Sequence, residues 1–192
     1  MQSSAQADTY QHVVVVMSMV LGLAVTQLLR GMAQLHRSRG RVRTYWLHWA
    51  WVTLLVFFSL LLWWTFWNYR GITEWNFLRF ALYLSPIIVL YYVTAIAFPD
   101  PSDNVAAIRE YYFANRVGFF GAFALCGVLA AIVAAVVRGL PLSDSSYVFR
   151  LGLVLLMFIV MRSQSPRVHA AVFVVCSSVM VLFIALYHFR LG

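Results

Sequence analysis

The sequence contains no lysine, because all fourteen of its basic residues are arginines. A lysine is needed for a Schiff base with a carbonyl ligand, so retinal pigments are excluded. Charged residues of either sign make up only 10% of the chain, against about 25% in a soluble domain. With 63% hydrophobic residues, a chain of 192 residues cannot hide its apolar surface from water. We therefore expect residues 1–192 to form one integral membrane domain with lipid as its solvent.

The sequence also lacks the usual signatures of catalytic and metal sites. Cys126 and Cys176 lie inside apolar runs, where a buried thiol behaves as a small hydrophobic group; their spacing indicates neither a disulfide nor a metal site. No Gly-x-Ser-x-Gly motif, His-Glu-x-x-His motif or close carboxylate pair at membrane depth is present, so a hydrolytic enzyme is not indicated. No cofactor is predicted. Because residues 1–11 lack the basic residues of a signal peptide, we expect the first apolar segment to remain in the mature protein.

Six apolar segments follow one another along the chain. About 20 helical residues cross a hydrocarbon core of ~30 Å. We expect an all-α polytopic membrane protein with six transmembrane helices, at about residues 12–35, 45–67, 75–98, 117–137, 147–161 and 168–188. The fifth segment is the shortest, because fifteen residues rise only about 22 Å.

A polar stretch, PDPSDNVAAIREYYFANRVGFF, separates the third segment from the fourth and holds three of the six acidic residues. Its two prolines end the third helix. The residues after them contain no helix breaker, which predicts a cytoplasmic interfacial helix at about 103–116 that continues into the fourth segment. We expect Glu110 or Asp103 to pair with an arginine of the first loop. The candidates for coupling at this surface are Asp103, Glu110, Arg109 and Arg116.

Arginines are concentrated after the first segment, where Arg37, Arg39, Arg41 and Arg43 fall within seven residues. Short arginine-rich loops remain in the cytoplasm, which predicts that both termini lie on the non-cytoplasmic side. Six crossings then place nine arginines on the cytoplasmic side and five on or toward the other side. The same loop would attract anionic lipid headgroups by about 1 kcal/mol per arginine. Nucleic acid is not an expected partner, since the arginines cluster at segment ends.

The polar stretch, together with SMVLGLAVTQLLRG in the first segment, resembles a group of small bacterial inner-membrane proteins to which no function is attached. The resemblance covers nearly the whole chain. It implies six helices and a location in the bacterial inner (plasma) membrane. It brings no activity, cofactor or site residue.

The sequence favours a small channel or transporter that is homo-oligomeric and favours anions. The candidates for a solute path or its coupling are arginines within apolar segments, a possible acidic partner, hydrogen-bonding groups at membrane depth and a helix-kinking proline: Arg79, Arg150, Glu74, Thr26, Gln27 and Pro86. Small residues recur at every fourth position in the first and fourth segments, which predicts that these helices pack on each other or on a second subunit. The packing candidates are Ser18, Gly22, Gly118, Ala122 and Ala130.

Two alternatives remain open from the sequence. The chain could be a structural or accessory subunit that binds a membrane-protein partner or anionic lipid through the arginine loop and the interfacial helix. It could also be a bis-histidine haem protein, because two histidine pairs are expected at matching depths. These pairs are His12 with His188 near the outer face, and His48 with His169 near the inner face.

Overall fold

The structure is a computed structural model that describes residues 2–72, 74–100 and 107–187. The prediction of an all-α protein is confirmed, since the described residues form helices and their connections with no strand. The elements are α1 (Gln2–Arg37), α2 (Trp46–Thr65), the 3-10 helix η1 (Phe66–Tyr69), α3 (Phe77–Ala95), α4 (Ile108–Ala114), α5 (Arg116–Val136), α6 (Ser146–Arg162) and α7 (Pro166–Tyr187).

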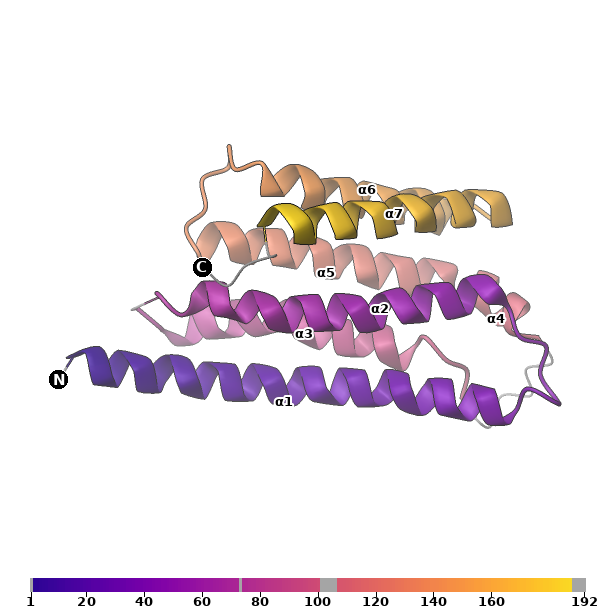
Figure 1. Ribbon diagram of the computed structural model, residues 1–192, viewed down its shortest axis with the longest axis horizontal. Helices are drawn as coiled ribbons and strands as arrows, with labels where there is room; N and C mark the ends of the chain where they lie inside the picture. The colour runs from indigo at the N-terminus through magenta and orange to yellow at the C-terminus, as the bar shows by residue number, and fades with distance from the viewer. Residues whose placement is uncertain (1, 73, 101–106, 188–192) are drawn as a thin grey trace.

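The long helices lie side by side in one bundle, and α4 is a short helix at its edge (Figure 1). The start of α1, η1 and the α5–α6 loop lie at one end, which we call the η1 end. The α1–α2 loop, α4 and the α6–α7 turn lie at the other end, which we call the α4 end (Figure 1). Successive long helices therefore run in opposite directions.

Five stretches are long and apolar enough to cross a membrane: Thr9–Arg37, Trp46–Tyr69, Phe77–Ala95, Arg116–Val136 and Pro166–Leu186. Large apolar side chains are exposed on the outside of the bundle, such as Leu23, Phe57, Leu155 and Val174. An apolar exterior of this extent suits contact with lipid rather than water. These features support a membrane protein. The remaining long helix is α6. It has 17 residues and covers 146–162, close to the predicted 147–161.

The segment before α5 differs from the prediction of one helix over 103–116 that runs into the fourth segment. Helix α4 covers only 108–114, and Asn115, with φ −92° and ψ 4°, separates it from α5. The Asn115 side chain donates a hydrogen bond of 3.2 Å to the carbonyl of Tyr111. Asparagine competes for nearby backbone groups in this way and so favours a break. Residues 101–106, including Asp103, lie outside the described residues.

Helix α5 is central and packs against α3 and α6, whereas α1 packs against α3 and α2. The face that α1 buries consists of Val13, Met17, Leu21, Ala24, Leu28 and Leu35. The predicted contact between the small residues of α1 and those of α5 is therefore wrong within one chain. A Cβ added at Gly22 would meet nothing within 4 Å, and Gly118 is exposed as well. Ser18, Ala122 and Ala130 are partly buried.

Close helix approach occurs instead at two other glycines. A Cβ at Gly31 of α1 would overlap the Phe98 ring, and one at Gly127 of α5 would lie 2.8 Å from Cγ2 of Val154 on α6. Both glycines therefore allow side chains of neighbouring segments to approach the helix backbone, which a larger residue would prevent.

Helix α3 continues through Pro86. Proline has no N–H for the carbonyl four residues earlier, and here the hydroxyl of Ser85 donates to that carbonyl, Leu82 O, at 2.7 Å. The thiol of Cys126 on α5 donates to the carbonyl of Pro86 at 3.2 Å. Side chains thus satisfy the backbone groups around the proline, as apolar surroundings require.

Candidate functional site

A cavity of about 140 Å³ lies between α2, α3, α5, α6 and α7 and reaches η1. Most of its wall is apolar, and every wall residue of α2 lies on one helical face. Among the residues that form the wall are Leu54, Phe58, Phe123, Val154, Met157 and Met180. Helix α1 contributes no residue to it.

Two arginines line this cavity, and no acidic residue does so among the described residues. Arg138 lies two residues after the end of α5, and Arg150 lies one turn after the start of α6, so both belong to the η1 end. We call this part of the wall the cationic end of the cavity. Arg150 donates through Nη1 to the hydroxyl of Ser146, and its guanidinium lies 5.6 Å from the ring centroid of Phe183. Arg138 is exposed and forms no ion pair or hydrogen bond with any described side chain.

Asp144 is the acidic residue nearest to Arg138 and Arg150 in the sequence, but it does not line the cavity. Its Oδ1 accepts a hydrogen bond of 2.8 Å from the backbone N–H of Ser146, at the start of α6. Hydrogen bonds from Ser146 lower the pKa of the Asp144 carboxyl, with smaller contributions from the charges of Arg150 and Arg138. The carboxylate thus stabilises the start of α6, whose N-cap residue is Ser145, and is not part of the cavity wall.

Two aromatic residues bring buried polar atoms to the cavity wall. The Tyr83 side chain of α3 is 4% exposed, and its hydroxyl makes no hydrogen bond with any described residue. Its ring centroid lies 4.3 Å from that of Tyr69. Trp51 of α2 is 1% exposed, and its indole N–H is likewise unpartnered within the described structure. Both atoms are themselves shielded from the cavity, so the wall that a ligand would touch here is aromatic.

Of the six solute-path candidates named from the sequence, Arg150 and Pro86 line the cavity. The packing candidate Ala130 also lines it. Sequence reasoning missed Arg138, Tyr69 and Tyr83. Arg138 could have been found from its position at the end of an apolar segment, because Arg150 lies near the start of the next apolar segment, on the same side of the bundle.

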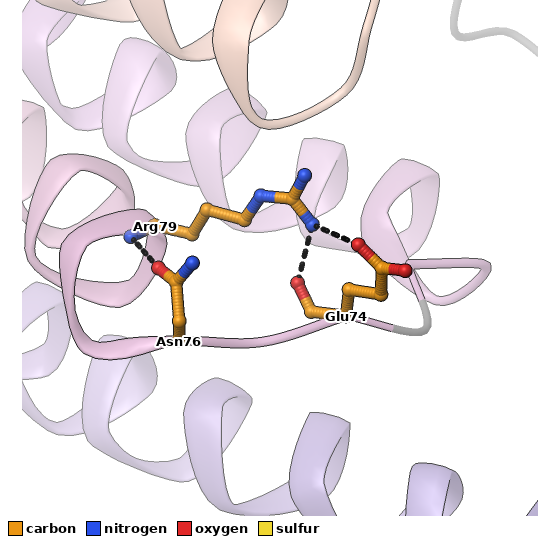
Figure 2. Close-up of polar contacts among 3 residues, drawn as sticks. All are labelled: Glu74, Asn76 and Arg79. Atoms are coloured by element: carbon orange, nitrogen blue, oxygen red, sulfur yellow. Dashed lines mark hydrogen bonds and ion pairs between the residues drawn. The ribbon is translucent and has the colours of Figure 1, made fainter.

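Arg79 and Glu74 lie at the surface end of α3 and do not line the cavity. Nη1 of Arg79 lies 3.5 Å from the Glu74 carboxylate and donates to the Glu74 carbonyl at 2.6 Å (Figure 2). The backbone N–H of Arg79 donates to Oδ1 of Asn76 at 2.9 Å, which caps α3 (Figure 2). This arginine sits so near its helix end that its side chain reaches back to the loop.

Thr26 and Gln27 do not line the cavity either, because both belong to α1. The hydroxyl of Thr26 donates to the carbonyl of Gly22 at 2.7 Å, within its own helix. The Thr26 hydroxyl is therefore satisfied within α1 and needs no solute as a partner.

At the α4 end, backbone and tyrosine contacts join the central segment to its neighbours. The N–H of Ile108 donates to the carbonyl of Arg43 at 3.0 Å. The hydroxyl of Tyr111 lies 3.0 Å from the carbonyl of Ile96 and 2.9 Å from that of Phe98. These contacts tie α4 to the arginine loop and to the end of α3.

The predicted ion pair of Glu110 is absent from the described structure. Glu110 is exposed and contacts no arginine there within ion-pair distance, and Asp103 lies outside the described residues. Water already solvates a carboxylate at this surface, so a pair would add little. The guanidinium of Arg109 lies 5.8 Å from the Phe113 ring centroid, and Nη1 of Arg116 donates to the Phe113 carbonyl at 2.7 Å. The loop arginines Arg37, Arg39, Arg41 and Arg43 are exposed.

Of the four histidines proposed as haem ligands, the structure describes His12, His48 and His169. His48 and His169 are both buried, and each ring packs against Tyr112. His169 has both ring nitrogens engaged, with Tyr112 and with Ser163. The cavity beside His48 measures only about 10 Å³, the size of one water molecule. His12 is exposed, and His188 lies outside the described residues.

Compared with known proteins, the chain matches no family model, no curated protein and no solved structure.

Proposed function

We propose that this chain is a small membrane transport protein, a transporter or channel, that takes an anion into the cavity between α2, α3, α5, α6 and α7. The observation that carries the proposal is the cationic end of the cavity, where Arg138 and Arg150 meet no acidic wall residue. Arginine remains charged in any protein environment and presents several N–H donors to a carboxylate or phosphate. Charges at membrane depth are costly and mark ion or substrate paths.

The proposal includes six membrane crossings. Helix α6, with 17 residues, rises about 25 Å. It packs against α5 and α7, so protein contacts cover part of its length where it falls short of the bilayer thickness. Small adjustments of bilayer thickness cover the rest.

Arginine distribution supports the orientation that we propose. The loop arginines 37, 39, 41 and 43, together with Arg109, Arg116, Arg162 and Arg167, belong to the α4 end. Since basic loops remain in the cytoplasm, we assign the α4 end to the cytoplasm and the cationic end of the cavity to the opposite side. We propose the bacterial inner membrane as the location, because the polar stretch resembles that of small bacterial inner-membrane proteins.

A homo-oligomer is also part of the proposal. In the stripe formed by Ser18, Gly22 and Thr26, the last two residues are exposed, and Gly22 has no neighbouring atom within 4 Å of an added Cβ. Small residues at every fourth position allow two membrane helices to approach closely. A second copy of α1 would fit this stripe.

Flux into proteoliposomes tests the transport proposal. Purified protein should move an anion such as acetate, phosphate or laurate faster than empty liposomes do. Replacing Arg150 or Arg138 by glutamine should lower the flux about 10-fold or more, because a hydrogen bond to a charged group contributes about 1.5–3 kcal/mol. Arg79→Gln is the matched control, since Arg79 pairs with Glu74 outside the cavity. Flux equal to that of empty liposomes for all three anions would refute transport.

One observation favours a second candidate, an accessory subunit that docks on a membrane partner or on anionic lipid. The hydrogen bond between Ile108 and Arg43 holds α4 against the arginine loop, so exposed arginines of both segments face the same surface. Co-purification tests this candidate. A stable partner, or anionic lipid lost on replacing the four loop arginines by glutamine, supports it; a clean oligomer with neither contradicts it.

A further inference from the structure

We infer that the cavity binds a long-chain amphipathic anion, with its carboxylate or phosphate between Arg138 and Arg150 and its single hydrocarbon chain along α2 toward Trp51. The inference concerns the cavity of the proposed function and names its ligand class. Such an anion has two sources, a free long-chain acid or an anionic phospholipid that places one of its two chains in the cavity. Both present the same chemistry, an anionic head on an unbranched chain.

The head group is indicated by two arginines that line the cavity with no acidic residue beside them in its described wall. Arg138 and Arg150 line the same cavity, and no acidic residue lines it in the described chain. The nearest acid in sequence, Asp144, already accepts from the N–H of Ser146. Of the donors of Arg150, the hydrogen bond to Ser146 uses one Nη1 group, and a guanidinium carries five N–H donors. An anion held by both arginines would satisfy the remaining donors.

Tyr83 lines the same part of the cavity, and its buried hydroxyl has no partner in the described structure. Tyr83 lies two turns into α3, which begins at the η1 end. The hydroxyl is therefore on the side of the cavity where the arginines lie, and not near Trp51. Together with the arginines, Tyr83 marks this end of the wall as the polar one.

The rest of the ligand is indicated by the apolar wall. Beyond the arginines and Tyr83, the wall consists mainly of aliphatic, aromatic and methionine side chains from α2, α3, α5, α6 and α7. An inorganic anion would leave this wall facing empty space or unfavourably placed water, because apolar cavities of this size stay dry. A hydrocarbon group fills such a space without any polar atom left unpaired.

The shape of the cavity favours one unbranched chain over a ring system. On α2 the wall runs from Trp51 to Thr65, fourteen residues apart, which is about 21 Å along a helix. A volume of about 140 Å³ stretched along this length leaves a narrow channel. The chain end of the ligand would then lie near Trp51, far from the arginines.

Fluorescence quenching of Trp51 tests both the ligand class and its direction. We suggest the full chain in phosphatidylcholine nanodiscs, titrated with 12-bromododecanoate, whose bromine sits at the chain end. The expected result is a saturable quenching component on top of the linear quenching of the lipid-facing tryptophans. Trp51→Phe should abolish that component. The neutral 12-bromododecanol should need at least about a 10-fold higher concentration for half-saturation, since it lacks the charge.

Variants distinguish the two parts of the site. Arg150→Gln and Arg138→Gln should each raise the half-saturating concentration of the acid about 10-fold or more and leave that of the alcohol unchanged. Arg162→Gln, the same charge change at an exposed position of the α4 end, should alter neither. Ala130→Phe fills the cavity without touching the arginines and should remove the saturable component. Thermal unfolding of each variant shows whether it has folded. In the folded arginine variants, the saturable component should remain and should require a higher concentration of the acid; no such shift would contradict the inference.

The source of the anion follows from repeating the titration in discs that contain phosphatidylglycerol. Competition by this lipid assigns the site to an anionic phospholipid; unchanged binding assigns it to a free acid. Equal half-saturation for acid and alcohol, or the absence of any Trp51-dependent component, would overturn the inference. Binding without flux in proteoliposomes would refute the transport proposal alone, whereas acetate flux without long-chain binding would refute this inference alone.

Discussion

The hydroxyl of Tyr112 on α4 lies 2.6 Å from Nδ1 of His169 on α7, and Nε2 of the same ring lies 3.0 Å from the carbonyl of Ser163. A carbonyl oxygen only accepts hydrogen bonds, so Nε2 carries the proton and Nδ1 accepts from Tyr112. The neutral imidazole is thereby fully satisfied although it is completely buried. One histidine thus joins α4 to the turn between α6 and α7.

Tyr112→Phe should lower the free energy of unfolding by about 1–3 kcal/mol, because it leaves the buried Nδ1 of His169 without its donor. Thermal unfolding in lipid nanodiscs measures the effect. Tyr92→Phe is the control, since Tyr92 is 55% exposed on α3 and should tolerate the loss of its hydroxyl. Equal unfolding temperatures for the two variants would show that the hydrogen bond contributes nothing.

Gly127→Ala should destabilise the contact between α5 and α6. The added Cβ would lie 2.8 Å from Cγ2 of Val154, and overpacking of this kind costs about 1–3 kcal/mol, more than the ~1 kcal/mol that alanine gains over glycine in a helix. Val154 cannot turn aside easily because a β-branched side chain in a helix has one preferred rotamer.

Gly152→Ala is the matched control for that change. It makes the same substitution on α6, where an added Cβ meets nothing within 4 Å, and should leave stability unchanged or raise it by up to about 1 kcal/mol. The double variant Gly127→Ala with Val154→Ala should recover part of the loss. If Gly127→Ala were as stable as Gly152→Ala, the close packing at Val154 would be refuted.

Helix number and extent could be predicted because they depend on the length of apolar runs. The short α6 is an example, since its residues 146–162 nearly equal the predicted 147–161. The start of α1 could not be predicted, because the polar residues before His12 continue the helix. The break at Asn115 was missed for a related reason: asparagine within a helical pattern is a weak signal until its side chain is seen to bond the backbone.

The faces that meet inside the bundle were much harder to predict. In a membrane protein, residues that face lipid are as apolar as those in the core, so Leu21, which is buried, and Leu23, which is exposed, look alike in the sequence. Arg150 and Pro86 could be proposed because they are exceptional within apolar segments. Tyr83 could not, since its importance depends on α3, η1 and α2 meeting around one cavity.

The two cysteines should differ in reactivity toward a small apolar thiol reagent such as N-ethylmaleimide. Cys176 lines the cavity, whereas Cys126 is completely buried and donates to the carbonyl of Pro86. The Cys126→Ala variant, which retains Cys176, should therefore be labelled faster than the Cys176→Ala variant, which retains Cys126. Mass spectrometry of the intact protein measures the rates. Faster labelling of Cys126 would show that the cavity does not reach α7 as the structure has it.

Stability at acidic pH should depend on Asp144. Hydrogen bonds from Ser146 lower the pKa of its carboxyl in the folded protein, so the charged carboxylate stabilises the start of α6 at pH values above the unfolded pKa of about 3.9. This stabilisation is lost as the pH falls through the lower, folded pKa. Asp144→Asn keeps an oxygen acceptor for the Ser146 N–H but removes the titration. Between pH 7 and pH 3, its unfolding temperature should therefore fall less than that of the natural chain.

Glu110→Gln, at an exposed position without a described ion pair, is the control and should follow the natural chain. Parallel curves for the natural chain and Asp144→Asn would exclude a role for the Asp144 charge at the start of α6.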